Sequence, residues 1–123
     1  MTRHIPREHW REELDSFSRQ HEGWIVRVDV TGPDGQTRTE ARDLPLQGVS
    51  ADSTRSDGVA ISVGQTADDH VTHEVNNPVT IAIEQTETGA ERALRIRARD
   101  GSTTTVEFRS PMRPEEVDGI PTR

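Results

Sequence analysis

The feature that most constrains the fold is a series of short runs in which apolar and polar residues alternate. The alternation is clearest in Trp24–Val30 and in Leu94–Ala98. Because side chains two residues apart share one face of a strand, each run predicts a β-strand with one buried and one exposed face. Turn-forming sequences such as Gly32-Pro33-Asp34-Gly35 separate the runs. The pattern therefore predicts antiparallel β structure from about residue 24 to residue 109.

Charge pairing suggests how the first two strands meet. A four-residue loop at 32–35 places Arg27 opposite Glu40 and Asp29 opposite Arg38. Opposite charges that face each other across two antiparallel strands stabilise the pair. We therefore expect a hairpin with this register.

Two further hairpins follow from the same logic. Strands at about 70–75 and 79–84 would be joined by Asn76-Asn77-Pro78, a turn signal. In the last hairpin, a three-residue or bulged turn would pair Leu94 with Phe108. A slip of one residue would turn the whole apolar set to the wrong face, which excludes a two-residue turn here.

A helical period precedes the strands. Trp10, Leu14 and Phe17 fall at i, i+4 and i+7 and form one apolar stripe. Pro6 suits the first position of a helix. These residues predict a helix over about 6–20 that docks on the sheet through the stripe.

Together the elements predict a mainly β fold with one N-terminal helix and an antiparallel meander of about eight short strands. We expect the meander to curl into a small barrel or sandwich, with the helix over one opening or face. The alternative is an open twisted antiparallel sheet with the helix packed across it. The length of 123 residues predicts a single domain over 1–123. Residues 110–123 show no period and are expected to form an irregular tail.

Composition narrows the functions that fit. The chain has no cysteine, which excludes disulfides and thiolate metal sites. No apolar run resembles a signal peptide or a membrane span, so we expect a cytoplasmic protein. The net charge is −7, from 22 acidic and 15 basic residues. This acidic balance disfavours binding to a phosphate backbone.

The densest group of metal-type donors is Asp68-Asp69-His70 with His73-Glu74. On a helix His70 and His73 would share a face, but on a strand residues three apart point to opposite faces. The strand pattern therefore separates the two rings, and we expect neither a metal nor another cofactor. His73 falls on the inner face, where it is a core histidine or a general acid or base.

Arginines line the outer face of the strand that begins near residue 92. Arg95, Arg97 and Arg99 alternate with the inner residues, and Arg92 and Arg109 are expected nearby. These arginines could form a surface for anions or nucleic acid. The strand offers no outward aromatic side chains on which bases could stack, so nucleic acid stays the less favoured partner.

Three functional hypotheses remain. The first is a non-enzymatic binding domain for a protein or small-molecule partner, as a monomer or homodimer. The second is nucleic-acid binding through Arg95 and Arg97. The third is a metal-assisted or acid–base enzyme centred on His70 and His73. For the first hypothesis the candidate residues are Trp24, His70, His73 and the segment Leu44–Asp52, whose Pro45 indicates an edge strand or a bend. We find no nucleophile motif.

Several segments together resemble a small bacterial family of uncharacterised proteins, a domain of unknown function. The resemblance covers nearly the whole chain and implies a single complete domain, but no activity, ligand or catalytic residue. The segments that carry it are Ile5-Pro6-Arg7 with Trp10, Phe17–Trp24, Ala41–Asp52, Asp69–His73, Glu84–Thr86 and Phe108–Pro111.

Overall fold

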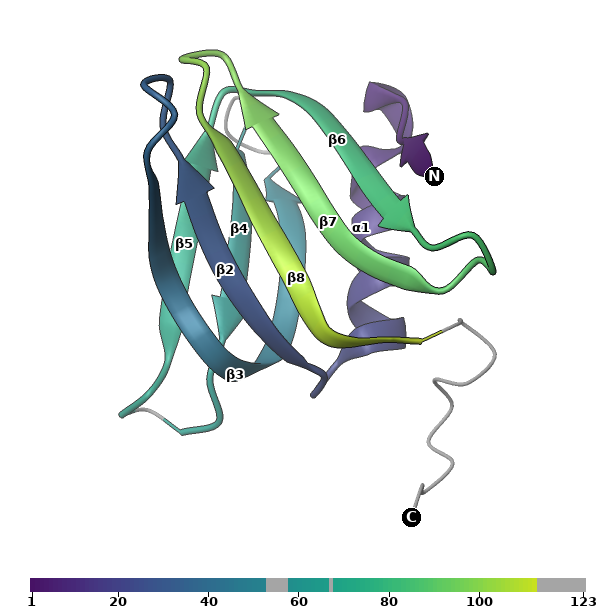
Figure 1. Cartoon of the computed structure of the whole chain (residues 1–123), viewed down its shortest axis with the longest axis vertical. Helices are drawn as coiled ribbons and strands as arrows, with labels where there is room; N and C mark the ends of the chain where they lie inside the picture. Colours follow the sequence, from purple (N-terminus) through teal and green to yellow (C-terminus); the bar gives the residue numbers. More distant parts are fainter. Residues whose placement is uncertain (53–57, 67, 113–123) are drawn as a thin grey trace.

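The computed structural model describes residues 1–52, 58–66 and 68–112. It shows one helical segment and an eight-stranded antiparallel sheet with the spatial order β1-β6-β7-β8-β2-β3-β4-β5 (Figure 1). The elements are β1 (Thr2–His4), the 3-10 turn η1 (Arg7–His9), α1 (Trp10–His21), β2 (Ile25–Thr31), β3 (Thr37–Asp52), β4 (Gly58–Val63), β5 (Val71–Asn76), β6 (Pro78–Gln85), β7 (Glu91–Ala98) and β8 (Thr103–Met112).

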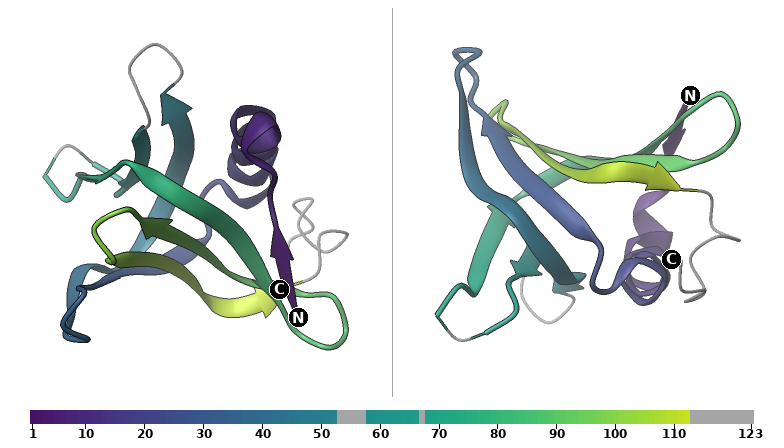
Figure 2. Two further views of the ribbon diagram at one scale, coloured as in Figure 1. Left: turned by 90° about the horizontal axis from the view of Figure 1, so that it is seen from above. Right: turned by 60° about the horizontal axis from the view of Figure 1, so that its bottom comes forward.

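The sheet is open and strongly twisted. It has two edges, β1 and β5, which are not paired with each other. Figure 2 shows that the sheet bends into a trough and that α1 lies across the open side. The alternative of an open twisted sheet is therefore confirmed, and the closed barrel or sandwich is wrong. The helix fills the side that a closing strand would have occupied, so the core lies between the two arms of the sheet and α1.

The apolar stripe of the helix is buried as expected. Trp10, Leu14 and Phe17 are at most 6% exposed. The Trp10 Nε1–H donates to the carbonyl of Ile5 at 2.9 Å, which fixes the entry to the helix. The hydroxyl of Ser18 accepts a hydrogen bond from Val49 N at 2.8 Å and so ties α1 to β3. None of the described helices is long and apolar enough to cross a membrane.

Strand β3 combines what the sequence predicts as two strands. Its first part pairs with β2 and its second part with β4, and Pro45 lies where the pairing changes. The expectation of a bend at Pro45 is confirmed, whereas an edge there is wrong because β3 lies between β2 and β4. The number of strands still reaches eight because β1, which the sequence did not predict, precedes the helix.

The predicted register of the β2–β3 hairpin is wrong by one residue. Thr31 pairs with Thr37, so Asp29 faces Thr39 instead of Arg38. Arg27 forms its ion pairs elsewhere, with Glu107 on β8. The charge pattern gave the wrong register because β2 also pairs with β8, which places the acidic Glu107 opposite Arg27.

The second predicted hairpin is also wrong, because β5 does not pair with β6. Strand β5 pairs with β4, and β6 pairs with β1 and β7. Only Asn77 separates the two strands, and its backbone adopts a positive φ of 55°. One residue is too short for a reversal, so the chain turns a corner and continues into the other arm of the trough.

The last hairpin has the predicted turn length but a different register. Ala98 N donates to Ser102 O at 2.9 Å across a turn formed by residues 99–101. Leu94 therefore pairs with Val106 instead of Phe108. A shift of two residues keeps every side chain on its face, so the apolar pattern could not distinguish the two registers.

The ends of the predicted β region also shift. Strand β8 continues to Met112, so an irregular tail from residue 110 is wrong for its first three residues. The remainder of the predicted tail lies outside the described residues. So does most of the run Asp52–Gly58, whose polar composition predicts a loop.

Candidate functional site

A bulge in β3 creates the most unusual feature of the outer face. Val28 of β2 pairs with Ala41, and Val26 pairs with Leu44. Arg42 and Asp43 therefore both lie opposite the single residue between those two β2 positions. Asp43 adopts a positive φ of 55°, a conformation that L-residues other than Asn and Asp seldom adopt. Bulges of this kind redirect side chains and occur next to functional sites.

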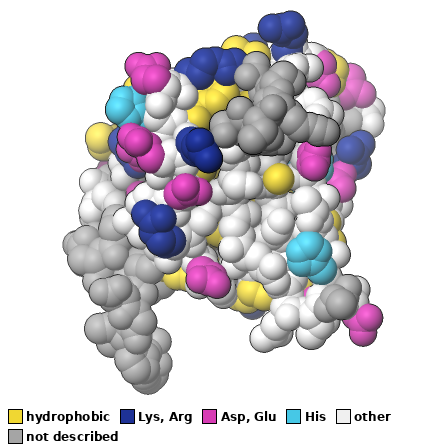
Figure 3. Space-filling view, turned by 180° about the vertical axis from the view of Figure 1, so that it is seen from behind, with side chains coloured by type: hydrophobic (Ala, Val, Ile, Leu, Met, Phe, Trp, Pro, Cys, Tyr) yellow, Lys and Arg dark blue, Asp and Glu magenta, His cyan; other side chains and the backbone are white. Residues whose placement is uncertain are grey.

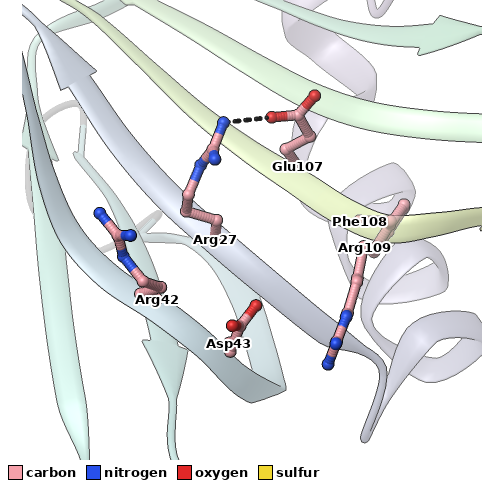
Figure 4. A pocket seen from close by; sticks show the side chains of 6 residues that line it. All are labelled: Arg27, Arg42, Asp43, Glu107, Phe108 and Arg109. Carbon is pink, nitrogen blue, oxygen red and sulfur yellow. Dashed lines mark hydrogen bonds and ion pairs between the residues drawn. The ribbon is translucent and has the colours of Figure 1, made fainter.

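The bulge borders a hollow of about 350 Å³, which we call the arginine hollow. Its lining comes from three adjacent strands and is drawn in Figure 4: Arg27, Arg42, Asp43, Glu107, Phe108 and Arg109. The three guanidinium groups lie around the hollow and do not converge on one point. This arrangement suits several anionic groups spread along a partner better than one small ion.

The three arginines differ in their partners. Arg27 is held by Glu107 at 2.9 Å and by Asp29 at 3.0 Å. Arg42 and Arg109 are exposed and have no ion-pair partner within residues 1–52, 58–66 and 68–112. Two cationic groups beside a hollow are therefore available for a binding partner.

A second hollow, of about 290 Å³, contains His73; we call it the His73 groove. It lies where β5 approaches the turns that end β2 and β7. Its polar lining includes Arg38, His73, Glu74, Asp100, Ser102 and Thr104. His73 is half-buried on the inner side of β5, as predicted, and its Nε2 lies 3.4 Å from Thr104 Oγ1.

Most charged groups of the His73 groove already have partners. Burial lowers the pKa of His73; the charge of Glu40 partly offsets this effect, and Arg38 adds to it. A hydrogen bond from Arg38 lowers the pKa of Glu40. The hydroxyl and the backbone N–H of Ser102 lower the pKa of Asp100. The groove therefore favours a neutral imidazole surrounded by satisfied charges.

The donors of the expected histidine cluster separate in space. His70 lies in the loop before β5 and is exposed, so it is not on the outer face of the strand. Asp69 stabilises that loop, where backbone N–H groups of Thr66 and Gln65 donate to its carboxylate and lower its pKa. In the described part of the chain no group of three or more metal-type donors could hold a metal ion.

Arg95 and Arg97 lie exposed on the outer face of β7. Arg95 is paired with Glu84 at 2.8 Å. Arg97 faces Thr103 and has no ion-pair partner among the described residues. By register it lies on the same outer face as Arg27 and Glu107 of the arginine hollow. The back of the molecule carries charged side chains of both signs (Figure 3).

Trp24 is half-buried and packs edge-on against Phe108, with ring centroids 5.0 Å apart. The segment Leu44–Asp52 forms the second part of β3, beneath α1. Both therefore support the core, and neither lines the arginine hollow.

Sequence reasoning missed the arginine hollow. Arg27 was assigned to a hairpin pair, Arg109 was placed only near the arginines of β7, and Arg42 received no role. The sequence signal was Arg42-Asp43, because the two residues between Ala41 and Leu44 break the alternation that would place every second side chain on the inner face. Sequence reasoning also missed His21 and Glu91, whose side chains meet in the core at 3.0 Å. Position i+4 from Phe17 places His21 on the apolar stripe, which was the available signal.

Comparison with known proteins gives a family without an assigned activity. The model described as Family of unknown function (DUF5335) matches residues 1–117. No curated protein and no solved structure matches the chain.

Proposed function

The chain belongs to this family of unknown function, and this membership assigns it no activity. From the geometry of the chain itself we propose that it is a non-enzymatic binding domain. Its partner would be a protein that presents an acidic segment to the arginine hollow. The observation that carries the proposal is a hollow built by a bulge and lined by Arg42 and Arg109, two arginines that form no ion pair with another described residue. The sequence adds the expectation of a bacterial cytoplasmic monomer or homodimer.

The chemistry of the hollow favours a polypeptide over nucleic acid. A guanidinium group binds carboxylates through paired N–H donors. Asp43 and Glu107 add acceptors that a peptide N–H could use. A phosphate backbone has no such donors, and the two carboxylates would repel it. The net charge of −7 adds a long-range repulsion that a short acidic segment feels less than a long nucleic acid.

The arginine hollow is a better binding site than the His73 groove because two of its arginines, Arg42 and Arg109, form no ion pair with another described residue. In the groove, Arg38 pairs with Glu40 and Asp100 binds Ser102. A partner would have to displace these contacts. At the arginine hollow it would displace no ion pair of Arg42 or Arg109 with another described residue.

The test is binding of a fluorescent hexaglutamate peptide, measured by anisotropy at low salt. The double variant Arg42→Ala/Arg109→Ala should weaken binding by about tenfold or more, because two charge-assisted contacts are lost. The double variant Arg11→Ala/Arg19→Ala is the matched control. It removes the same charge from exposed arginines of α1 and should change the affinity less than about twofold, since screening weakens distant charges.

Three results would overturn the proposal. One is no binding of the peptide by the wild-type chain at low salt. Another is an equal loss in both double variants, which would mean that only net charge matters. The third is tighter binding of a single-stranded oligonucleotide than of the peptide, which would favour nucleic acid as the partner.

A further inference from the structure

Two ionisable side chains meet inside the core, where the last residue of α1 lies against the first residue of β7. His21 is fully buried at the last position of α1, and Glu91 is 5% exposed at the first position of β7. His21 Nε2 lies 3.0 Å from Glu91 Oε1. The contact is poorly aligned for a straight hydrogen bond, and neither atom has another hydrogen-bond partner among the described residues.

The hydrogen bond of the other ring nitrogen of His21, Nδ1, indicates how many protons the pair holds. His21 Nδ1 lies 2.7 Å from the carbonyl oxygen of Phe17. A carbonyl oxygen only accepts, so Nδ1 carries a hydrogen and donates it. In a neutral ring Nε2 would then present a lone pair to Glu91. Against an ionised carboxylate that contact is repulsive, and burial makes such repulsion costly.

We infer that His21 and Glu91 hold one shared proton in the folded protein and that this proton latches α1 onto the sheet. The proton lies on Nε2, as an imidazolium–carboxylate pair, or on the carboxyl group, which then donates to Nε2. Both arrangements bind the same number of protons. The last turn of a helix favours a positive charge, which supports the first arrangement.

Aromatic rings cover the His21 side of the pair. The imidazole packs against Phe17, Trp24 and Phe108 with ring centroids 4.4, 4.6 and 4.6 Å away. On the side of Glu91 a hollow of about 160 Å³ brings in Arg3 from β1 and Glu13 from α1.

These two charged groups and a third nearby have other partners. Arg3 and Glu13 face each other, with Nη1 and Oε1 3.5 Å apart. Arg92, next to Glu91, reaches Glu84 at 3.7 Å. Glu91 therefore has His21 as its nearest ionisable partner.

A shared proton makes folding depend on pH in a defined direction. An imidazole in an unfolded chain has lost its second proton above about pH 6.5, and the unfolded carboxylate is ionised there. The folded pair keeps the proton, so the folded state binds one proton more than the unfolded state. The stability from the latch is therefore complete between about pH 4.5 and pH 6.5, where the unfolded carboxylate is ionised and the unfolded imidazole is protonated, and it falls as the pH rises. The unfolding equilibrium constant should rise about tenfold per pH unit above about pH 6.5.

The test is urea unfolding of the full chain between pH 6 and pH 9. Glu91→Gln is the informative variant, because its amide N–H can donate to a neutral Nε2 and needs no extra proton. We expect it to remove the tenfold-per-unit dependence that the wild type shows. Glu12→Gln is the control, since it alters the exposed His9–Glu12 pair, whose atoms are also 3.0 Å apart. This variant should keep the wild-type dependence.

An identical pH dependence in wild type and Glu91→Gln would overturn the inference. If Glu91→Gln does not fold, NMR of the wild type at pH 7.5 decides instead. The ¹⁵N shifts of His21 and the ¹³Cδ shift of Glu91 should show a protonated Nε2 or a protonated carboxyl. A neutral ring with unprotonated Nε2 beside an ionised carboxylate would contradict the shared proton.

Discussion

The His21–Glu91 pair and the arginine hollow place charge in opposite surroundings. The buried pair lies among aromatic rings, and each of its two groups has the other as its ion-pair partner. The hollow lies on the outer face, where Arg42 and Arg109 face water beside a strained bulge. A buried charge must find its partner within the fold, because an unpaired one is very unfavourable there. An exposed charge is stable without a protein partner and stays available for binding. We therefore expect the His21–Glu91 pair to govern stability and the arginine hollow to govern binding.

The largest effect is expected from removing one member of the buried pair. His21→Ala should lower the free energy of unfolding by about 3–5 kcal/mol, because it leaves Glu91 buried without a partner. Urea denaturation at pH 6.5 measures the loss. His9→Ala removes a histidine from an exposed pair with the same separation and should cost about 0.5 kcal/mol or less. Similar losses in the two variants would show that burial does not separate the pairs.

Substitutions of Asp43 test whether the backbone of the bulge beside the arginine hollow is strained. Asp43→Ala places a residue that disfavours positive φ at 55° and should lower stability by about 1 kcal/mol. Asp43→Gly should stay within about 0.5 kcal/mol of wild type, because glycine adopts this conformation readily. Asp15→Ala, at an exposed helical position, is the control for loss of the carboxylate and should not destabilise. Equal stabilities of the two Asp43 variants would contradict the strained backbone.

Glu107 offers a way to change binding without changing the core. Glu107→Gln releases Arg27 from one of its two ion pairs and removes a negative charge from the arginine hollow. The affinity for hexaglutamate at low salt should rise about threefold, while stability changes by less than about 1 kcal/mol. Glu12→Gln makes the same charge change on α1 and should leave the affinity nearly unaltered. An unchanged affinity in Glu107→Gln would mean that the peptide does not use this side of the hollow, and a loss of affinity would mean that it needs the Glu107 carboxylate.

The smallest effect concerns His73, whose pKa is lowered chiefly by burial. Glu40→Gln should lower the pKa of His73 further, because the Glu40 charge favours the imidazolium form. NMR titration of the His73 ring measures both values. A lowered pKa means that this residue's contribution to stability is present above about pH 6.5 and is lost as the pH falls, the opposite sign to the His21–Glu91 pair. An increase of the pKa in Glu40→Gln would contradict the assigned cause.

The alternation of apolar residues predicted which face each strand buries, and it predicted this well. Val26, Ile61 and Ile96 are all at most 1% exposed. The pairing of strands was harder, because a pattern with period two allows every even shift. The β7–β8 register shows this, since pairing Leu94 with Val106 or with Phe108 keeps the same faces.

The sites depended on contacts that the local sequence does not encode. The arginine hollow exists because β8 lies beside β2, which brings Arg109 near Arg42. His21 and Glu91 meet only because α1 lies across the open side of the sheet. The predicted exposure of Arg95 and Arg97 and the inner position of His73 followed from the period alone, and the structure places them so.

The most direct test of the central claim is a titration of the ¹⁵N-labelled chain with hexaglutamate at low salt. We expect the largest amide shift changes at Arg42, Asp43 and Arg109, with smaller changes at Arg97. The amides of Asp100 and Ser102 in the His73 groove should move little. Changes concentrated in the His73 groove, or spread evenly over all exposed arginines, would contradict binding at the arginine hollow.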